Sequence, residues 1–404
     1  MNKIQDFNFS NKKAIVRVDF NVPINEDGIV TDDTRIKAAL PTIKTILDKG
    51  GSVLLLSHWG RPQKALKKDP NTSIENFSLK RIIPNIEKHL NKEVHFIANL
   101  EDKKGINSWN NASSGSLYLM ENIRWYEEEE KGDNSFAAKL AELGDVFVND
   151  AFGTAHRAHA STATIAQYFD KENKLFGQLM QNEIDAANKV LSKAEKPFTA
   201  IIGGAKVSDK ILIIENLLEK ATDIIIGGGM AYTFMKAQGG TIGNSLVEED
   251  RMEKALEILA KAKEKNVTIH LPEDSKVADA FSNDSSTKFE DSNAISEGWM
   301  GLDIGPKAKE SFREVLLKSK TILWNGPMGV FEMEAFQDGS KAIAESVKDA
   351  TKAGAYSLVG GGDSVAAIKK FGYENDVSYI STGGGALLEF FEGKNLPGIK
   401  AIAE

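Results

Sequence analysis

The sequence contains no cysteine, which excludes disulfide bonds and thiolate metal sites. It has no apolar run near the roughly 20 residues that cross a bilayer, and its N-terminus lacks the apolar core of a signal peptide. Basic residues are outnumbered, since 50 Lys and Arg stand against 58 Asp and Glu and give a formal net charge of −8. These absences predict a cytoplasmic protein with neither a membrane nor a nucleic acid as its partner.

Two common nucleotide-binding motifs are missing as well. The only Gly-Lys pair, Gly393-Lys394, is followed by Asn395, so no G-x-x-x-x-G-K-[ST] loop is present. No complete G-x-G-x-x-G fingerprint is found either, which leaves a nicotinamide dehydrogenase without direct support. The segment AIIGGAKVSDKI, residues 200–211, runs from an apolar stretch into glycines, a lysine and a serine. It suggests a phosphate-binding loop of another kind.

Short apolar runs of strand length recur along the chain, separated by longer helical patterns. Near-continuous apolar strands that alternate with helices predict parallel sheets covered on both faces. The predicted strands are 14–21, 52–58, 94–97, 116–122 and 145–152 in the first half, and 199–204, 223–229, 267–272, 321–327, 356–363 and 377–385 in the second. A chain of 404 residues exceeds one ordinary core. The class is therefore α/β, with two doubly wound parallel-sheet (Rossmann-like) lobes.

The boundary between the lobes is expected within residues 176–198, which have the pattern of one long helix. The apolar positions of this helix are Leu179, Met180, Ile184, Val190 and Leu191. A helix joining the two lobes is favoured, and an ordinary crossover helix within one domain is the alternative. The four glutamates at 127–130 are expected to form a solvated loop or a helix start.

Polar and cationic side chains follow the apolar runs of the first half, where ligands bind in parallel α/β sheets. They are Asp19, Asn21, His58, Arg61, Arg124, His156, Arg157 and His159, and Arg35 lies between two runs. Guanidinium groups match phosphate and carboxylate geometry, so the repeated placement of arginines after strands predicts a binding site for a small, multiply charged anion. A surface salt bridge is the alternative for any single arginine. A metal site at His156 and His159 is disfavoured, because no carboxylate or cysteine nearby completes a ligand set.

Glycine clusters follow the strands of the second half, at 203–204, 227–229, 326–329, 360–362 and 383–385. Each could be a plain tight turn, but glycines also let backbone amides approach a phosphate closely. Ser364 is expected to cap a helix that Gly372 ends, which puts Asp363 at the helix start as a metal ligand. Lys206 and Lys210 are expected one helical turn apart around the start of a helix. One half therefore suits a compact anion and the other a nucleotide, as in a two-domain phosphotransferase.

Nine segments of the chain, taken in order, resemble the motifs of phosphoglycerate kinases. They are RVDFNVP (17–23), SHWGRP (57–62), NDAFGTAHRAHAS (149–161), GGAKVSDKI (203–211), GGGMAYTF (227–234), GWMGLDIGP (298–306), LWNGPMGVFE (323–332), GGGDS (360–364) and STGGGA (381–386). The resemblance implies a phosphoglycerate-binding domain at 1–176, a connecting helix at 177–196, a nucleotide-binding domain at 197–390, and a tail at 391–404 that packs back on the first domain. It also implies a monomer that transfers the acyl phosphate of 1,3-bisphosphoglycerate reversibly to ADP, giving 3-phosphoglycerate and ATP, with Mg²⁺.

The resemblance also implies roles for individual residues. The phosphoglycerate ligands would be Asp19, Phe20, Asn21, Arg35, His58, Arg61, Arg124 and Arg157. The nucleotide ligands would be Gly204, Ala205, Lys206, Lys210, Gly228, Gly229, Gly301, Asn325, Pro327, Glu332, Gly361, Gly362, Asp363 and Ser364, with Glu332 on the ribose and Asp363 on the metal. Arg35, Lys206, Gly361 and Gly384 would be catalytic. Family members often have leucine in place of Trp59 and threonine in place of Ser364, and neither change removes a needed group.

The reaction explains why no general base is evident in the sequence. A carboxylate acceptor is already ionised at neutral pH, so catalysis reduces to alignment and charge stabilisation. A non-enzymatic two-lobed phosphometabolite-binding protein is the alternative. It would not explain why one half is rich in arginine and the other in glycine.

Overall fold

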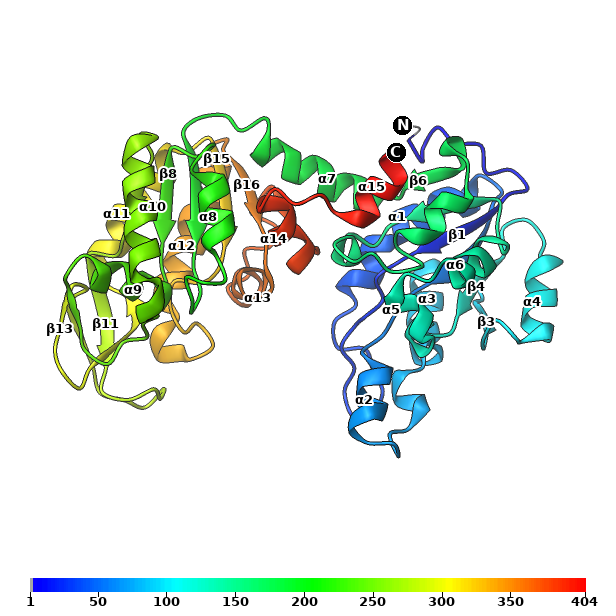
Figure 1. Cartoon of the computed structure of the whole chain (residues 1–404), viewed down its shortest axis with the longest axis horizontal. Helices are drawn as coiled ribbons and strands as arrows, with labels where there is room; N and C mark the ends of the chain where they lie inside the picture. Colours follow the sequence, from blue (N-terminus) through cyan, green and yellow to red (C-terminus); the bar gives the residue numbers. More distant parts are fainter. Residues whose placement is uncertain (1–2) are drawn as a thin grey trace. The chain divides into compact units, whose positions relative to one another are not determined.

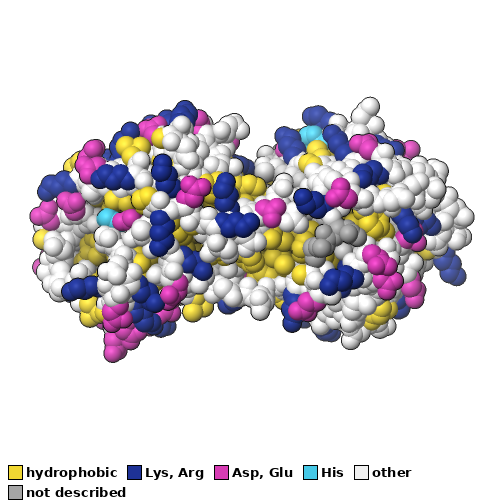
Figure 2. All heavy atoms as spheres, turned by 90° about the horizontal axis from the view of Figure 1, so that it is seen from above, with side chains coloured by type: hydrophobic (Ala, Val, Ile, Leu, Met, Phe, Trp, Pro, Cys, Tyr) yellow, Lys and Arg dark blue, Asp and Glu magenta, His cyan; other side chains and the backbone are white. Residues whose placement is uncertain are grey.

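The structure, a computed structural model, describes residues 3–404, and the chain divides into two compact units. The first unit comprises the chain up to Ile184 together with Asn395–Glu404, and the second comprises Asp185–Lys394. Helices flank a parallel sheet in each unit (Figure 1). On the face seen in Figure 2, acidic and basic side chains are interspersed. None of the helices described is both long and apolar enough to cross a membrane.

The first unit is built on a six-stranded parallel sheet of order β3-β4-β2-β1-β5-β6. The strands are β1 Lys13–Arg17, β2 Ser52–Leu56, β3 His95–Ile97, β4 Leu117–Met120, β5 Val146–Asn149 and β6 Lys174–Phe176. Every residue of β2, β4 and β5 is buried, as expected of strands covered on both faces. The five predicted strands are confirmed, whereas β6 was missed because three residues at a sheet edge give no periodic signal.

Helices of the first unit cover both sides of this sheet. They are α1 Thr34–Asp48, α2 Pro62–Lys68, α3 Ile83–Leu90, α4 Lys103–Asn110, α5 Glu127–Lys131, α6 Asn134–Ala141 and α15 Pro397–Ala403, with short 3-10 helices at Ile74–Phe77, Leu79–Ile82, Ile123–Trp125, Phe152–Thr154, Thr164–Tyr168 and Lys171–Asn173. The C-terminal α15 packs within this unit: Gly398 N donates to Ala155 O at 2.8 Å, and Lys174 Nζ donates to Ala401 O at 3.0 Å.

The second unit has a six-stranded parallel sheet of order β10-β8-β7-β15-β16-β17. Its strands are β7 Phe198–Ile202, β8 Asp223–Ile226, β10 Thr268–His270, β15 Thr321–Asn325, β16 Tyr356–Val359 and β17 Tyr379–Ile380. All six predicted strands of this half are confirmed. In both units the chain enters mid-sheet and winds outward in both directions, so the predicted α/β class with two doubly wound sheets is confirmed.

The helices of the second unit lie around this sheet. They are α8 Ile211–Leu217, α9 Met230–Ala237, α10 Met252–Glu264, α11 Pro306–Lys318, α12 Asp338–Lys352, α13 Gly362–Lys370 and α14 Gly385–Phe391, with 3-10 helices at Glu249–Arg251 and Glu334–Phe336. Side chains of α11, α12 and α13 share one core with the sheet, including Phe312, Trp324 and Val347.

A second layer of strands in this unit was not predicted. A three-stranded antiparallel sheet joins β12 Thr287–Asp291, β11 Asp274–Ala278 and β14 Met300–Ile304, and a small pair joins β9 Thr241–Ile242 to β13 Ala294–Ile295. These strands do not form apolar runs, because they carry charged residues or are only two residues long, so the sequence pattern did not indicate them.

The helix α7, Gln178–Leu191, spans the boundary between the two units, but it is shorter than the predicted 177–196. Pro197 disfavours helical geometry at the residue before it. The segment before β7 instead bonds to the start of β15, where Thr321 Oγ1 donates to Glu195 O at 2.9 Å and Lys320 N donates to Pro197 O at 2.8 Å.

Candidate active site

A cavity of about 270 Å³ lies in the first unit, beyond the carboxyl ends of its strands. It is lined by Asp19, Asn21, Arg35, His58, Gly60, Arg61, Arg124, Gly153, Thr154, His156 and Arg157. The loops after β1 and β5, neighbouring strands from which the chain winds in opposite directions, both contribute, which is where doubly wound sheets bind ligands. Four arginines face a single carboxylate here, so the cavity suits a multiply charged anion. We call it the anion cavity.

The structure brings seven of the eight predicted phosphoglycerate ligands to the anion cavity. The exception is Phe20, which does not line the cavity and whose side chain is fully buried in the core. Its amide donates to Ser57 Oγ at 2.9 Å and fixes the loop after β1. The lining residues Gly60, Gly153 and Thr154 were not predicted, although each lies within a quoted motif.

Arg35 is oriented by the loop after β1 rather than by its own helix. Its Nη1 lies 3.1 Å from both carboxylate oxygens of Asp19 and donates to Asn21 O, also at 3.1 Å. The nearby Asp33 pairs instead with Lys37 at 2.9 Å and with His89 at 2.7 Å. Arg35 therefore lies at the cavity without being tied into the helix surface, and its side chain is 38% exposed.

Two histidines near the cavity are held uncharged by their surroundings. Burial, followed by the nearby guanidinium groups of Arg17 and Arg124, lowers the pKa of His58 well below its usual range. Burial and then Arg124 lower the pKa of His159 to about 4. Both rings are thus neutral at physiological pH. Within residues 3–404 no group of three or more His, Cys, Asp or Glu forms a metal site.

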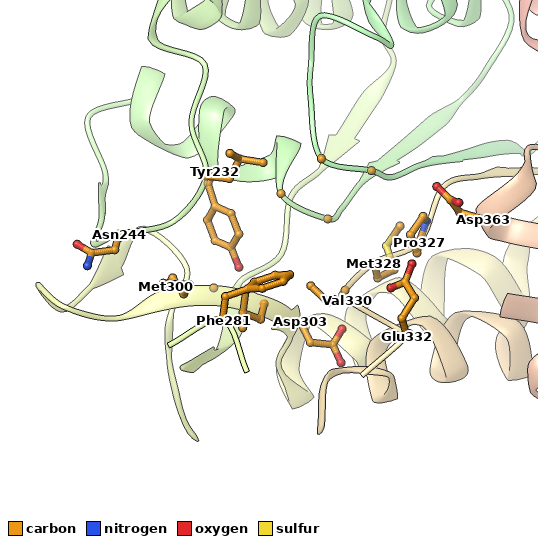
Figure 3. A pocket seen from close by; sticks show the side chains of 18 residues that line it. Tyr232, Asn244, Phe281, Met300, Asp303, Pro327, Met328, Val330, Glu332 and Asp363 are labelled. Carbon is orange, nitrogen blue, oxygen red and sulfur yellow. The ribbon is translucent and has the colours of Figure 1, made fainter. Parts of the chain in front are cut away.

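A larger cavity of about 510 Å³ lies in the second unit (Figure 3). It is lined by Gly204, Ala205, Gly228, Gly229, Tyr232, Asn244, Leu246, Phe281, Met300, Gly301, Leu302, Asp303, Pro327, Met328, Gly329, Val330, Glu332 and Asp363. The carboxylates of Asp363 and Glu332 lie at one end, and Tyr232 and Asn244 lie at the other. Apolar walls with acidic groups at one end suit a ligand with a flat apolar part and a polar part. We call it the glycine-lined cavity.

Close backbone packing shapes this cavity. Gly228 has φ +69°, and a Cβ there would lie 2.6 Å from Gly204 O. Only glycine fits such a position without moving the neighbouring chain.

Eight of the fourteen predicted nucleotide ligands line the glycine-lined cavity. The other six, which do not line it, are Lys206, Lys210, Asn325, Gly361, Gly362 and Ser364. Lys210 Nζ donates to Asn325 Oδ1, and Asn325 Nδ2 donates to Gly360 O at 2.8 Å. These contacts tie Lys210 and Asn325 to the loop that leads into α13, whose first turn carries Asp363.

Two local expectations in this region are wrong. Ser364 does not cap α13: the N-cap is Gly361, and the fully buried Ser364 hydroxyl accepts a hydrogen bond from Gly326 N at 2.5 Å. Lys210 is the N-cap of α8 and so lies at the start of a helix as expected, but Lys206 precedes this helix, so the two lysines are not one helical turn apart. Gly384, predicted to be catalytic, is the N-cap of α14.

The apolar lining and one buried acid were missed by the sequence analysis. Tyr232, Phe281 and Met300 provide much of the apolar wall. Asp303, in the quoted segment GWMGLDIGP, accepts from Gly339 N at 2.8 Å and from Ile304 N at 2.9 Å, and burial raises its pKa to about 7. Its carboxyl thereby anchors the start of α12 beside the cavity.

Comparison with known proteins shows which family the chain belongs to. The family model described as phosphoglycerate kinase matches residues 4–394. The chain belongs to the phosphoglycerate kinase family. A phosphoglycerate kinase of Porphyromonas gingivalis is 50% identical, with 99% of each chain covered. The solved phosphoglycerate kinase of Coxiella burnetii is 40% identical with a TM-score of 0.89, over 100% of this chain and 98% of that one. That of Pyrococcus horikoshii is 31% identical with a TM-score of 0.82, over the same shares.

Membership of the phosphoglycerate kinase family identifies the chain as a phosphotransferase of glycolysis. The resemblance drawn from the nine motifs is thereby confirmed. The alternative of a non-enzymatic two-lobed binding protein is not supported, because whole-chain relatives at this level of identity are described as kinases.

Proposed function

We propose that the anion cavity binds 3-phosphoglycerate or 1,3-bisphosphoglycerate and that the glycine-lined cavity binds ADP or ATP. The observation that supports this division is the contrast between the two linings. Four arginines suit the carboxylate and phosphate of a small acid. Apolar walls with Tyr232 and Phe281 suit a nucleobase, and backbone glycines suit phosphates. The protein would work as a cytoplasmic monomer.

The proposed mechanism needs no general base. The acceptor carboxylate of 3-phosphoglycerate is ionised at neutral pH, so positioned cations supply the catalysis. Arg35 in the first unit and Lys206 in the second, with the amides near Gly361 and Gly384, would stabilise the phosphoryl group during transfer. A coupled assay with ATP and 3-phosphoglycerate tests the overall activity. Calorimetric titration of each substrate alone tests the division between the cavities.

The residues at the glycine-lined cavity fit a magnesium ion bound together with the nucleotide. Mg²⁺ is typically held by one or two carboxylates plus substrate phosphates and water, rather than by a cage of protein ligands. Asp363 provides an exposed carboxylate in the first turn of α13 and lines the cavity. The ion would neutralise charge on the nucleotide phosphates, and Asp363 would hold it in place.

Replacing Asp363 by asparagine is expected to impair use of the magnesium nucleotide selectively. An amide of nearly the same size is a poor magnesium ligand, so the KM for MgATP should rise by about tenfold or more. The affinity for 3-phosphoglycerate should change little. Calorimetry with each substrate separates the two effects, and Glu374→Gln, an exposed change beyond α13, is the control. Equal weakening of both substrates would place Asp363 outside the nucleotide site.

Binding of both substrates together is expected to change the solution dimensions of the protein. Each cavity is lined by residues of one unit alone, so direct transfer requires the two ligands to be brought together. Closure should be greatest in the ternary complex, where both units have bound ligands. Small-angle scattering would then report a smaller radius of gyration than for either binary complex. An unchanged radius in the ternary complex would contradict closure.

A further inference from the structure

A buried polar network lies behind the anion cavity and contacts His58, one of the residues that line the cavity. Arg17 ends β1 and Glu129 belongs to α5, and both side chains are fully buried. Ser161 bridges them: its Oγ lies 2.8 Å from Arg17 Nε and 2.7 Å from Glu129 Oε1, and its amide lies 2.9 Å from Glu129 Oε2. Residues 127–130 form the start of a helix, one of the two expected alternatives, but Glu129 within it is buried rather than solvated. A buried guanidinium and a buried carboxyl that share a bridging serine are held in a fixed arrangement by these hydrogen bonds.

The chemistry of the donors determines the direction of every bond in this network. A guanidinium can only donate, so Ser161 Oγ accepts from Arg17 Nε. The hydroxyl proton of Ser161 is then directed to Glu129 Oε1, while the Ser161 amide donates to Oε2. Glu129 accepts on both oxygens, as a carboxylate does. Burial raises the pKa of the Glu129 carboxyl, whereas the Arg17 guanidinium and the two hydrogen bonds from Ser161 oppose that shift and favour the carboxylate, whose negative charge compensates the buried positive charge of Arg17.

The same rule determines which nitrogen of His58 carries a proton. Arg17 Nη2 lies 3.3 Å from His58 Nδ1, and Arg17 can only donate. Nδ1 must therefore be the unprotonated acceptor, which leaves the proton of the ring on Nε2. His58 lines the anion cavity, so the ring can present an N–H donor there.

The other guanidinium groups around His58 act in the same direction, and one carboxylate opposes them. Arg124 and Arg35, from two separate segments, disfavour a second proton on the ring, as would His159 if it were charged. The Asp19 carboxylate lies 4.0 Å from Nδ1 and would favour the cation, but both of its oxygens are 3.1 Å from Arg35 Nη1. The lowered pKa of His58, caused first by burial, agrees with this arrangement.

We propose that Glu129, Ser161 and Arg17 are positioning residues that hold His58 as the neutral Nε2–H tautomer, so that it offers phosphoglycerate a hydrogen-bond donor instead of a charge. This inference rests on the proposed assignment of the anion cavity to phosphoglycerate. The arginines then supply the charge that attracts the substrate, and the neutral donor supplies direction. Because His58 stays neutral, its contact does not vary with pH across the physiological range.

Nitrogen NMR of the histidine rings tests the tautomer directly in the free protein. The His58 resonances, assigned from their loss in His58→Asn, should show the neutral Nε2–H pattern from about pH 5.5 to pH 8. An Nδ1–H pattern, or an imidazolium that forms with an ordinary midpoint near pH 6.5, would overturn the proposal. Titration with 3-phosphoglycerate is a separate measurement. If it leaves the His58 resonances unmoved while the tautomer is as expected, the assignment of the cavity fails and the tautomer stands.

Glu129→Gln tests whether the network acts on His58. The amide removes the charge and one acceptor, so Arg17 should lose its fixed position and the Nε2–H pattern should give way to a mixture. The KM for 3-phosphoglycerate should rise about tenfold, as for the loss of one charge-assisted hydrogen bond, with the KM for MgATP within about twofold. Glu127→Gln, an exposed change on the same helix, is the control. An unchanged His58 pattern and KM in Glu129→Gln would overturn the positioning role. If Glu129→Gln does not fold, Ser161→Ala is tested instead by the same two measurements, the His58 NMR pattern and the KM for 3-phosphoglycerate.

Discussion

Replacing Arg35 by alanine is expected to lower kcat by about 10²–10³, a loss of roughly 3–4 kcal/mol of transition-state stabilisation. The family resemblance implies that its guanidinium donates to the phosphoryl group during transfer. The contacts of Arg35 are compatible with this role, because Asp19 and Asn21 O engage only its Nη1. The KM for 3-phosphoglycerate should change less than kcat, since Arg61, Arg124 and Arg157 remain to hold the substrate.

Two further variants separate catalysis by Arg35 from a structural role. Arg35→Lys should recover only part of the loss, because an ammonium cannot reproduce the guanidinium fork. Lys37→Ala is the control, since Lys37 is on the same helix and forms an exposed pair with Asp33, an interaction worth about 0–1 kcal/mol. Steady-state kinetics with circular dichroism as a check on folding would measure all three. A folded Arg35→Ala enzyme with a kcat near that of the parent would contradict the catalytic role.

The parallel sheets could be predicted from sequence because their strands are buried on both faces. Strands such as β2 and β15 are buried at every residue and therefore appear as uninterrupted apolar runs. By contrast, β12 alternates exposed and half-buried residues and includes Lys288 and Glu290. Its stability comes from pairing with β11, a tertiary contact that no local pattern reveals. The short β6 and β9 were missed because three and two residues are too few to give a periodic signal.

The polar residues that line the two cavities could be predicted better than the residues that surround and support them. Strand ends concentrate such residues, and motifs of five to thirteen residues identify them. The network behind His58 was not predicted, because Arg17 and Ser161 are 144 positions apart and a run of four glutamates gives no sign that one is buried. Likewise, Phe20 lies between two cavity residues in the loop after β1, yet its side chain is fully buried in the core, a tertiary contact that no local pattern reveals.

Replacing Gly326 by alanine is expected to lower the free energy of unfolding of the second unit by roughly 3–5 kcal/mol, combining backbone strain with overpacking. Gly326 directly follows β15 and has φ +106°, and a Cβ there would lie 2.1 Å from Gly203 O. Gly203 follows the neighbouring β7, and its amide donates to Asn325 O at 2.9 Å. Neither backbone segment can move without breaking this pairing.

The same change is expected to reduce nucleotide binding, because Gly204 and Pro327, the residues that follow this close approach, both line the glycine-lined cavity. Gly354→Ala is a matched control: its φ is +102°, but nothing lies within 4 Å of the added Cβ. It carries the backbone strain alone, which costs about 1–3 kcal/mol.

Denaturant unfolding and calorimetric titration with MgADP would compare the two variants. Equal loss of stability in both, with nucleotide affinity retained, would mean that the approach of Gly326 to Gly203 shapes neither the core nor the cavity. A larger loss in Gly326→Ala, accompanied by weaker binding of MgADP, would identify the junction of β7 and β15 as the structural base of the nucleotide site.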